Sequence, residues 1–462
     1  MKDLTKDPWI QILGVLALVS GLVALIRQVP GSAAVAAPAA QVPAPPAPAA
    51  PVAAPGVREP GGSELSAPPL LRALRARRPG RWVVDLGRSL DADTDSIAEA
   101  LHNAVSGDQI IIRPGRYREN LRVFKDVALM GDPERAGDAI LDGGEGTALE
   151  VQSSEVVLRR LTLSSSGMGT RVEGGFLTAS DCRWEGGGTG VSVEGGASLK
   201  ITGGVFARLE EAVSALGSPA RAELSGIKVQ GGKNGLSVQG GAVLKAERSE
   251  LRDLRECAFK ASDKDSRLEV SASKVSGNGR GACVRDRARA AFVDAEFFDN
   301  AKALSAEDEA SISLERSTVL RNGDPAISAS GKSSLKLTDS QAGKNKGVAL
   351  ALAGGSRAEL ERVKLVDNLG EGAALKEGSQ LTATKLDALG NSSCGIIVQD
   401  AGTIVLTKSR LNGNLCGIAL YRGGKLEVKD SDLTDNRKGP LLFKEAFRSE
   451  IEIKGSGNIP KL

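Results

Sequence analysis

Apolar residues recur along the second half of the chain at fixed distances from a repeated asparagine. The positions ten, eight and three residues before each asparagine are apolar in all eight repeats. The two-residue step between the first pair is the alternation of a β-strand, in which every second side chain points to the same face. The repeated asparagines, spaced by 22 or 23 residues, are Asn278, Asn300, Asn322, Asn345, Asn368, Asn391, Asn414 and Asn436. The pattern therefore predicts stacked short strands that share one core.

A second short apolar strand follows each asparagine, as at Gly395–Val398 and Gly417–Leu420, and glycine-rich turns lead to the next long strand. A period of about 22 residues with three short strands is typical of a solenoid whose stacked repeats bury one continuous core. Weaker copies of the pattern run from Thr147 to Cys257. We predict an all-β fold, a parallel β-helix of about 12–14 coils that ends near Ile459.

The asparagines themselves allow two interpretations. Asparagine tolerates the left-handed backbone region of a sharp turn, and its amide can hydrogen-bond to the copies above and below. This favours a structural ladder. The alternative is an asparagine-lined track for a ligand.

The first part of the repeat domain contains an ordered series of elements. An amphipathic helix is predicted over Thr94–Val105 and a buried strand over Gln109–Ile112; a PGxYxE motif at Pro114–Glu119 and a strand over Val127–Gly131 follow. This order resembles the opening coil of the pectin-lyase-like superfamily of right-handed parallel β-helix proteins, which includes pectin methylesterases. The resemblance implies a right-handed solenoid whose first coil is capped by the helix.

The resemblance carries the fold and not an activity. The chain has none of the superfamily's enzymatic signatures, which are GHG in polygalacturonases, WIDH in pectate lyases, and QDT and DFIFG in pectin methylesterases. Its single histidine, His102, also limits acid–base and metal chemistry. We expect no cofactor and no metal, and we favour a protein without catalytic activity.

The N-terminal region reads as a tether. Ile10–Ile26 is almost wholly apolar and just long enough to span a bilayer, although a cleaved signal peptide with a site near Ala34–Ala36 remains an alternative. Because Lys2 and Lys6 precede the apolar run, the positive-inside rule places the rest of the chain outside. We therefore predict a transmembrane anchor at residues 1–29, a proline- and alanine-rich linker at 30–70 and the β-helix at 71–462.

The outward face of the long strands contains one notable charged group, formed by Glu315, Lys336, Glu359 and Glu361. We expect Glu315 and Glu361 in one row, two coils or about 9.6 Å apart, with Lys336 between them. That separation is at the upper limit for an inverting carboxylate pair. A solvated ion cluster is the favoured interpretation, because exposed pairs of this kind are common.

The five cysteines have no metal-binding spacing. Cys394 and Cys416 are 22 residues apart, so they should stack one coil apart, within the range of a disulfide. A disulfide and a stacked reduced pair both remain open.

Net charge is +3 with 25% charged residues, which gives no overall attraction to nucleic acid. We expect a membrane-tethered, extracytoplasmic binding module or scaffold, and the resemblance makes carbohydrate or cell-envelope polymer the favoured ligand. One alternative is a polysaccharide lyase, hydrolase or epimerase with an unrecognised site, and a second is a structural spacer or adhesin. The sequence identifies no protein partner.

Overall fold

The computed structural model describes residues 80–152, 154–421, 423–443 and 452–460. All of them belong to one compact unit, Leu71–Leu462. The predicted anchor at 1–29 and the linker at 30–70 lie outside the described residues. No helix of the described part is long and apolar enough to cross a membrane.

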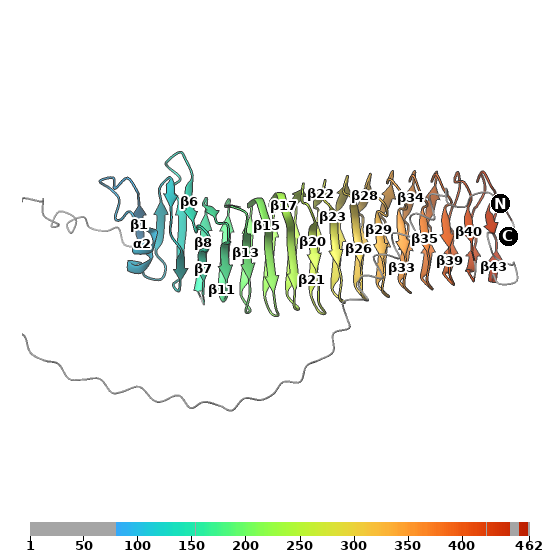
Figure 1. Ribbon diagram of the computed structural model, residues 1–462, viewed down its shortest axis with the longest axis horizontal. Coiled ribbons are helices and arrows are strands. Elements are labelled where there is room, and N and C mark those ends of the chain that lie inside the picture. The colour runs from blue at the N-terminus through green and yellow to red at the C-terminus, as the bar shows by residue number, and fades with distance from the viewer. Residues whose placement is uncertain (1–79, 153, 422, 444–451, 461–462) are drawn as a thin grey trace, which may run out of the picture. The chain divides into compact units, whose positions relative to one another are not determined.

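The long strands form one continuous parallel sheet, which we call sheet A (Figure 1). From β14 to β43, each of these strands is five residues long, and its outward and inward side chains alternate. The 17 strands of sheet A are β1 (Arg81–Val84), β2 (Gln109–Ile112), β5 (Val127–Gly131), β8 (Ser154–Arg159), β11 (Gly175–Ser180), β14 (Ser198–Thr202), β16 (Arg221–Ser225), β18 (Val243–Glu247), β21 (Arg267–Ser271), β24 (Arg289–Val293), β27 (Ser311–Glu315), β30 (Ser334–Thr338), β33 (Arg357–Glu361), β36 (Gln380–Thr384), β39 (Thr403–Thr407), β41 (Lys425–Lys429) and β43 (Glu452–Ser456).

The shorter strands form a second parallel sheet, sheet B, which holds the other two strands of each coil. The two series are joined into one sheet because in β15 and β17 they run together as a single 12-residue strand. The 26 strands of sheet B are β3 (Gly115–Tyr117), β4 (Leu121–Val123), β6 (Ala139–Asp142), β7 (Thr147–Val151), β9 (Thr162–Ser164), β10 (Met168–Val172), β12 (Arg183–Glu185), β13 (Thr189–Val193), β15 (Val205–Leu216), β17 (Lys228–Gln239), β19 (Glu250–Arg252), β20 (Cys257–Ala261), β22 (Lys274–Ser276), β23 (Arg280–Val284), β25 (Glu296–Phe298), β26 (Lys302–Ala306), β28 (Thr318–Leu320), β29 (Ile327–Ala329), β31 (Gln341–Gly343), β32 (Leu350–Leu352), β34 (Lys364–Val366), β35 (Ala373–Leu375), β37 (Asp387–Leu389), β38 (Ile396–Val398), β40 (Ile418–Leu420) and β42 (Leu441–Phe443).

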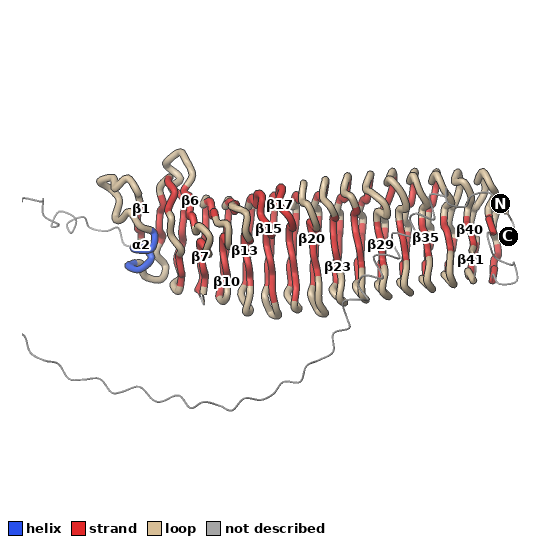
Figure 2. The backbone as a smooth tube through the Cα atoms, viewed as in Figure 1, coloured by secondary structure: helices blue, strands red, loops and turns tan. Residues whose placement is uncertain are grey.

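The described residues thus form a parallel β-helix whose strands stack in chain order along one axis (Figure 2). Sheet A contributes one strand to each coil, and its 17 strands exceed the 12–14 coils that the repeat predicts. The sequence underestimates the number because the first coils lack the asparagine and vary in length. For example, β2 and β5 begin 18 residues apart, whereas β5 and β8 begin 27 apart.

One hydrophobic cluster runs the length of the solenoid, from Val84 to Leu433. It contains the apolar positions ten, eight and three residues before each ladder asparagine, as the pattern predicts. Its largest side chains stack on one another between coils: the rings of Trp184 and Phe206 are parallel with centroids 4.7 Å apart. Burial of such apolar area is the main stabilising contribution in folding.

A helix, α2 (Ile97–Asn103), lies at the N-terminal end of the described solenoid, and Ile97, Ala100 and Leu101 pack into the core cluster. Its N-terminus is held by the last residue of the PGxYxE motif. The Glu119 carboxylate accepts hydrogen bonds from the backbone N–H groups of Ile97 and Ala98, at 3.0 and 2.7 Å. A carboxylate at this place satisfies otherwise unpaired N–H groups and complements the helix dipole.

The asparagine ladder is present, and its amides are bonded from coil to coil. Each Nδ2 donates to the Oδ1 of the next asparagine at 2.8–3.3 Å, and the same Oδ1 accepts the backbone N–H of the asparagine below. The expected left-handed conformation is wrong for the asparagines themselves. The preceding residue adopts it instead, as at Gly277, Asp299 and Arg321. This turn leaves the asparagine side chain pointing into the solenoid, where Asn345 and Asn368 are fully buried.

Candidate functional site

The outer face of sheet A, which we call the long-strand face, carries three rows of side chains. In each five-residue strand the first, third and fifth residues point outward, and parallel pairing aligns them from coil to coil. We call the lines of first, third and fifth residues the first, middle and third rows. All four residues of the predicted charged group lie on this face: Lys336 and Glu359 in the middle row, and Glu315 and Glu361 in the third.

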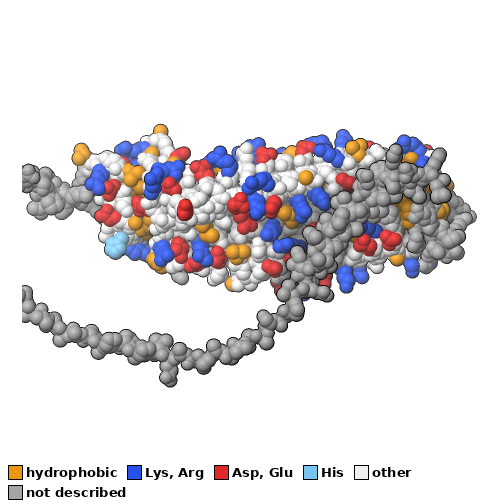
Figure 3. Space-filling model, viewed as in Figure 1, with side chains coloured by type: hydrophobic (Ala, Val, Ile, Leu, Met, Phe, Trp, Pro, Cys, Tyr) orange, Lys and Arg blue, Asp and Glu red, His pale blue; other side chains and the backbone are white. Residues whose placement is uncertain are grey.

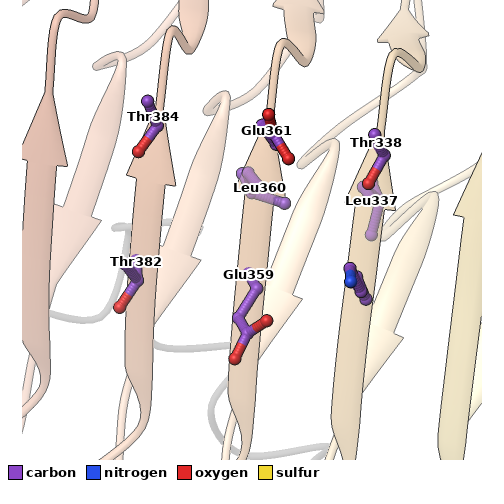
Figure 4. Close-up of a pocket in the computed structure, with 8 residues that line it drawn as sticks. Leu337, Thr338, Glu359, Leu360, Glu361, Thr382 and Thr384 are labelled. Atoms are coloured by element: carbon purple, nitrogen blue, oxygen red, sulfur yellow. The ribbon is translucent and has the colours of Figure 1, made fainter.

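A shallow depression of about 320 Å³ lies across β30, β33 and β36 on this face. Lys336, Glu359 and Glu361 line it, whereas Glu315 does not. Figure 4 shows the outward side chains on three neighbouring strands, with Leu337 and Leu360 turned toward the interior. The remaining outward lining side chains are threonines, Thr338, Thr382 and Thr384. The depression is therefore lined by hydroxyl, carboxylate and ammonium groups over an apolar layer.

The register corrects one sequence expectation. Glu315, Thr338 and Glu361 are successive members of the third row, so Thr338 and not Lys336 lies between the two glutamates. Lys336 is the direct partner of Glu359 in the middle row. The error is a shift of two residues along the strand, which moves a side chain to another row of the same face.

Glu361 is held in place by a turn arginine. The guanidinium of Arg362 donates to the Glu361 carboxylate and to both oxygens of Asp339 in the preceding coil, with Nη2 at 2.8 Å from Oδ2. The hydrogen bonds from Asp339, and then from Glu361, raise the pKa of Arg362 above its ordinary value. Arg316 forms the same arrangement with Glu315 and Asp294. Both third-row glutamates are thus fixed by neighbouring cations.

The middle row neutralises its own charges. Glu223 lies between Lys200 and Lys245 in the register, and the Lys245 ammonium is 3.0 Å from the carboxylate of Glu269. Over the described surface, basic and acidic side chains are likewise interspersed in the view of Figure 3. The first row differs. From β16 to β41 it contains Arg221, Val243, Arg267, Arg289, Ser311, Ser334, Arg357, Gln380, Thr403 and Lys425, with no acidic residue.

The threonines of the depression and the first-row arginines were missed as site residues by the sequence interpretation. The signal was available, because the asparagine register places each of them on the outward face. A search for acid–base chemistry passes over hydroxyls and unpaired cations, whose meaning depends on what lies beside them. Among the described residues no group of three or more histidine, cysteine, aspartate or glutamate side chains could hold a metal ion.

Two disulfides join neighbouring coils of sheet B. Cys394 and Cys416 are bonded, with Cα atoms 4.5 Å apart, which resolves the alternative left open by the sequence. Cys257 and Cys283 form a second disulfide, with a Cα separation of 6.1 Å. Their 26-residue spacing is one coil plus a further step along the strand, so the spacing alone did not indicate it. The remaining cysteine, Cys182, is free and buried, and burial raises the pKa of its thiol to about 11.

Comparison with known proteins supports the architecture. The family described as "Right handed beta helix region" matches residues 211–365 and 351–455. The chain matches no curated protein.

Three solved structures with similar folds share little sequence with this chain. The periplasmic alginate epimerase AlgG has 13% identity over 74% of this chain and 78% of its own, with a TM-score of 0.38. The mannuronan C-5 epimerase AlgE6 A-module of Azotobacter vinelandii has 11% identity over 78% and 92%, with a TM-score of 0.32. The GH87 α-1,3-glucanase of Streptomyces thermodiastaticus has 11% identity over 78% and 64%, with a TM-score of 0.31. These values transfer no activity to this chain.

The family match covers more than half of the sequence, and its residues coincide with the regular coils from β15 to β43. Its description also gives the handedness that the opening coil implies. The chain therefore belongs to the right-handed parallel β-helix family, of the pectin-lyase-like type.

Proposed function

We propose that this protein is a binding module for an extended polysaccharide or cell-envelope polymer. The observation that carries the proposal is the depression on the long-strand face, where Thr338, Thr382 and Thr384 stand beside Glu359, Glu361 and Lys336. Hydroxyl, carboxylate and ammonium groups supply donors and acceptors for sugar hydroxyls. The coils repeat every 4.8 Å or so, a spacing comparable to one extended sugar unit.

The arrangement favours binding over cleavage. A glycoside hydrolase needs one protonated and one ionised carboxyl group, placed on the two sides of the scissile bond. Glu359 and Glu361 are alternate residues of a single strand, and each stands beside a cation, Lys336 or Arg362. Nothing in their surroundings separates an acid from a base. A lyase, hydrolase or epimerase remains the alternative that polymer cleavage or epimerisation would reveal.

Removing the two outermost hydroxyls should weaken polymer binding without unfolding the coil. The double variant Thr382→Val/Thr384→Val keeps the branched shape that suits a strand, and it deletes two hydrogen-bonding groups. We expect about tenfold weaker retention of the full-length protein on immobilised envelope polysaccharide, since each hydrogen bond contributes about 0.5–1.5 kcal/mol.

The matched control is Thr318→Val/Thr189→Val, which removes two half-buried outward hydroxyls from sheet B. This control should bind like the wild type. Equal retention by both double variants would show that the depression is not the binding site. A protein that retains no polymer at all would favour the structural spacer or adhesin.

We also infer that the β-helix lies outside the cytoplasm, tethered by the apolar N-terminal segment. Two disulfides support this placement, because such bonds persist in oxidising compartments and are rare in the cytosol. A periplasm-active reporter fused after Pro69 should be active, and a reporter that works only in the cytoplasm should be silent. The reverse pattern would place the domain inside.

A further inference from the structure

Four exposed arginines line one edge of the long-strand face. They are the first-row residues Arg221, Arg267, Arg289 and Arg357. Within the described part of the chain, their guanidinium groups form no ion pair and no side-chain hydrogen bond, whereas Arg316 and Arg362 on the opposite edge are fully paired. The long-strand face is thus basic along one edge only.

Stacking these arginines has an energetic cost that the fold avoids elsewhere. Arg267 and Arg289 are direct partners on adjacent strands, and like charges directly opposite each other are destabilising. Two residues along the same strands, the middle row alternates lysine and glutamate. A carboxylate in the first row would have neutralised the pair in the same way. An external anion would offset the repulsion.

We propose that the first row binds a linear polyanion whose carboxylate or phosphate groups lie along the solenoid axis. This inference rests on the proposed function and specifies the chemical class of the polymer. Guanidinium groups are suited to the task because their planar forks bind carboxylate and phosphate through two parallel hydrogen bonds.

The spacing of the arginines fits a regular polymer. Arg267 and Arg289 are one coil apart, Arg221 is two coils from Arg267, and Arg357 is three coils from Arg289. These steps correspond to about 4.8, 9.6 and 14 Å, all multiples of one strand spacing. An extended chain with a regular charge repeat can therefore meet all four side chains over a length of about 29 Å.

The row also passes the depression. Arg357 shares strand β33 with Glu359 and is two residues away on the same face, about 7 Å. A polymer that occupies the depression with its hydroxyls can place its anionic groups against Arg357. The glutamates of the third row then lie on the far side, which sets the orientation of the polymer across the face.

The same features argue against nucleic acid and against a lipid surface. Single-stranded nucleic acids are held by aromatic side chains on which bases stack, and the outward positions from β16 to β41 hold none. An anionic bilayer would cover the whole face and meet Glu247, Glu315 and Glu361 together with the arginines.

The test compares polymers and charge variants with the full-length protein. The probes are polyglucuronate, inorganic polyphosphate, neutral dextran and single-stranded DNA, with affinities measured at low and high salt. We expect at least one of the first two polymers to bind at least about tenfold more tightly than dextran, and its affinity to fall as salt rises. The double variant Arg267→Gln/Arg289→Gln should weaken that binding by about tenfold or more.

The matched control, Arg208→Gln/Arg280→Gln, removes two exposed arginines from sheet B and should bind within about twofold of the wild type. Circular dichroism verifies that both variants are folded. If dextran binds as well as the polyanions and the two double variants behave alike, the inference is wrong and the proposed function stands. If no polymer binds, both are wrong. If DNA binds as tightly as the polyanions, through the same arginines, the assigned polymer class is wrong.

Discussion

Replacing Asn345 by aspartate should destabilise the β-helix more than any surface change described above. In the native ladder the Asn345 amide nitrogen donates to the Val319 carbonyl and to Asn368 Oδ1, at 3.3 and 2.8 Å. An ionised aspartate of the same shape would place an acceptor against both oxygens and a charge in a fully buried site. We expect a loss of at least about 4 kcal/mol, because an uncompensated buried charge costs several kcal/mol.

Asn345→Ala should cost about 3 kcal/mol, since it removes the same donor and leaves the Asn322 N–H without its acceptor. Chemical unfolding followed by circular dichroism measures both losses. The control Asn103→Asp lies on the exposed surface of α2 and should cost less than about 1 kcal/mol. A stable Asn345 variant that had lost polymer binding would favour the alternative of an asparagine-lined ligand track.

Replacing Phe292 by alanine should open a cavity in the middle of the core. The ring is fully buried and makes edge-to-face contacts with Phe259 and Phe297, at centroid distances of 5.8 and 5.1 Å. Deleting a buried phenylalanine side chain costs about 3–5 kcal/mol. Because each coil contacts only its neighbours, we expect the loss to be local and to weaken the junction between the two halves of the solenoid.

The control for this variant lies in the next strand of the chain. Phe298 belongs to β25 beside Phe297, but its side chain points outward and is half-buried, with the Arg321 guanidinium 5.8 Å from its ring centre. Phe298→Ala should cost about 1 kcal/mol or less. Amide hydrogen exchange should show faster exchange in β21–β27 for Phe292→Ala only. Uniform exchange changes along the whole solenoid would contradict local coupling.

The sequence predicts the fold of the regular coils well because one residue type marks each turn. An apolar position counted from Asn345 or Asn391 lies in the core without exception, since a parallel stack requires the same register in every coil. The first coils are less predictable, because they are closed by individual interactions. The Glu119 carboxylate at the helix N-terminus and the Arg113–Asp85 ion pair, 2.9 Å long, join segments that no period connects.

The candidate site could be predicted only in part. Alternation places Glu359 and Glu361 on the outward face, but the depression depends on how their neighbours are sized and bonded. Thr382 leaves room where a longer side chain would fill it, and Arg362 draws Glu361 toward the turn. Pairing between rows is a property of the register, which is why Lys336 was first placed beside the wrong glutamates.

The central claim is that the long-strand face holds a polymer and leaves it intact. The most direct test incubates the full-length protein with purified envelope polysaccharide and measures both the retained fraction and the chain-length distribution of the polymer. The account predicts saturable retention with an unchanged length distribution, and a clear loss of retention in Thr382→Val/Thr384→Val. Shortened or unsaturated chains would show catalysis, and absent retention would show that this face is not a binding surface.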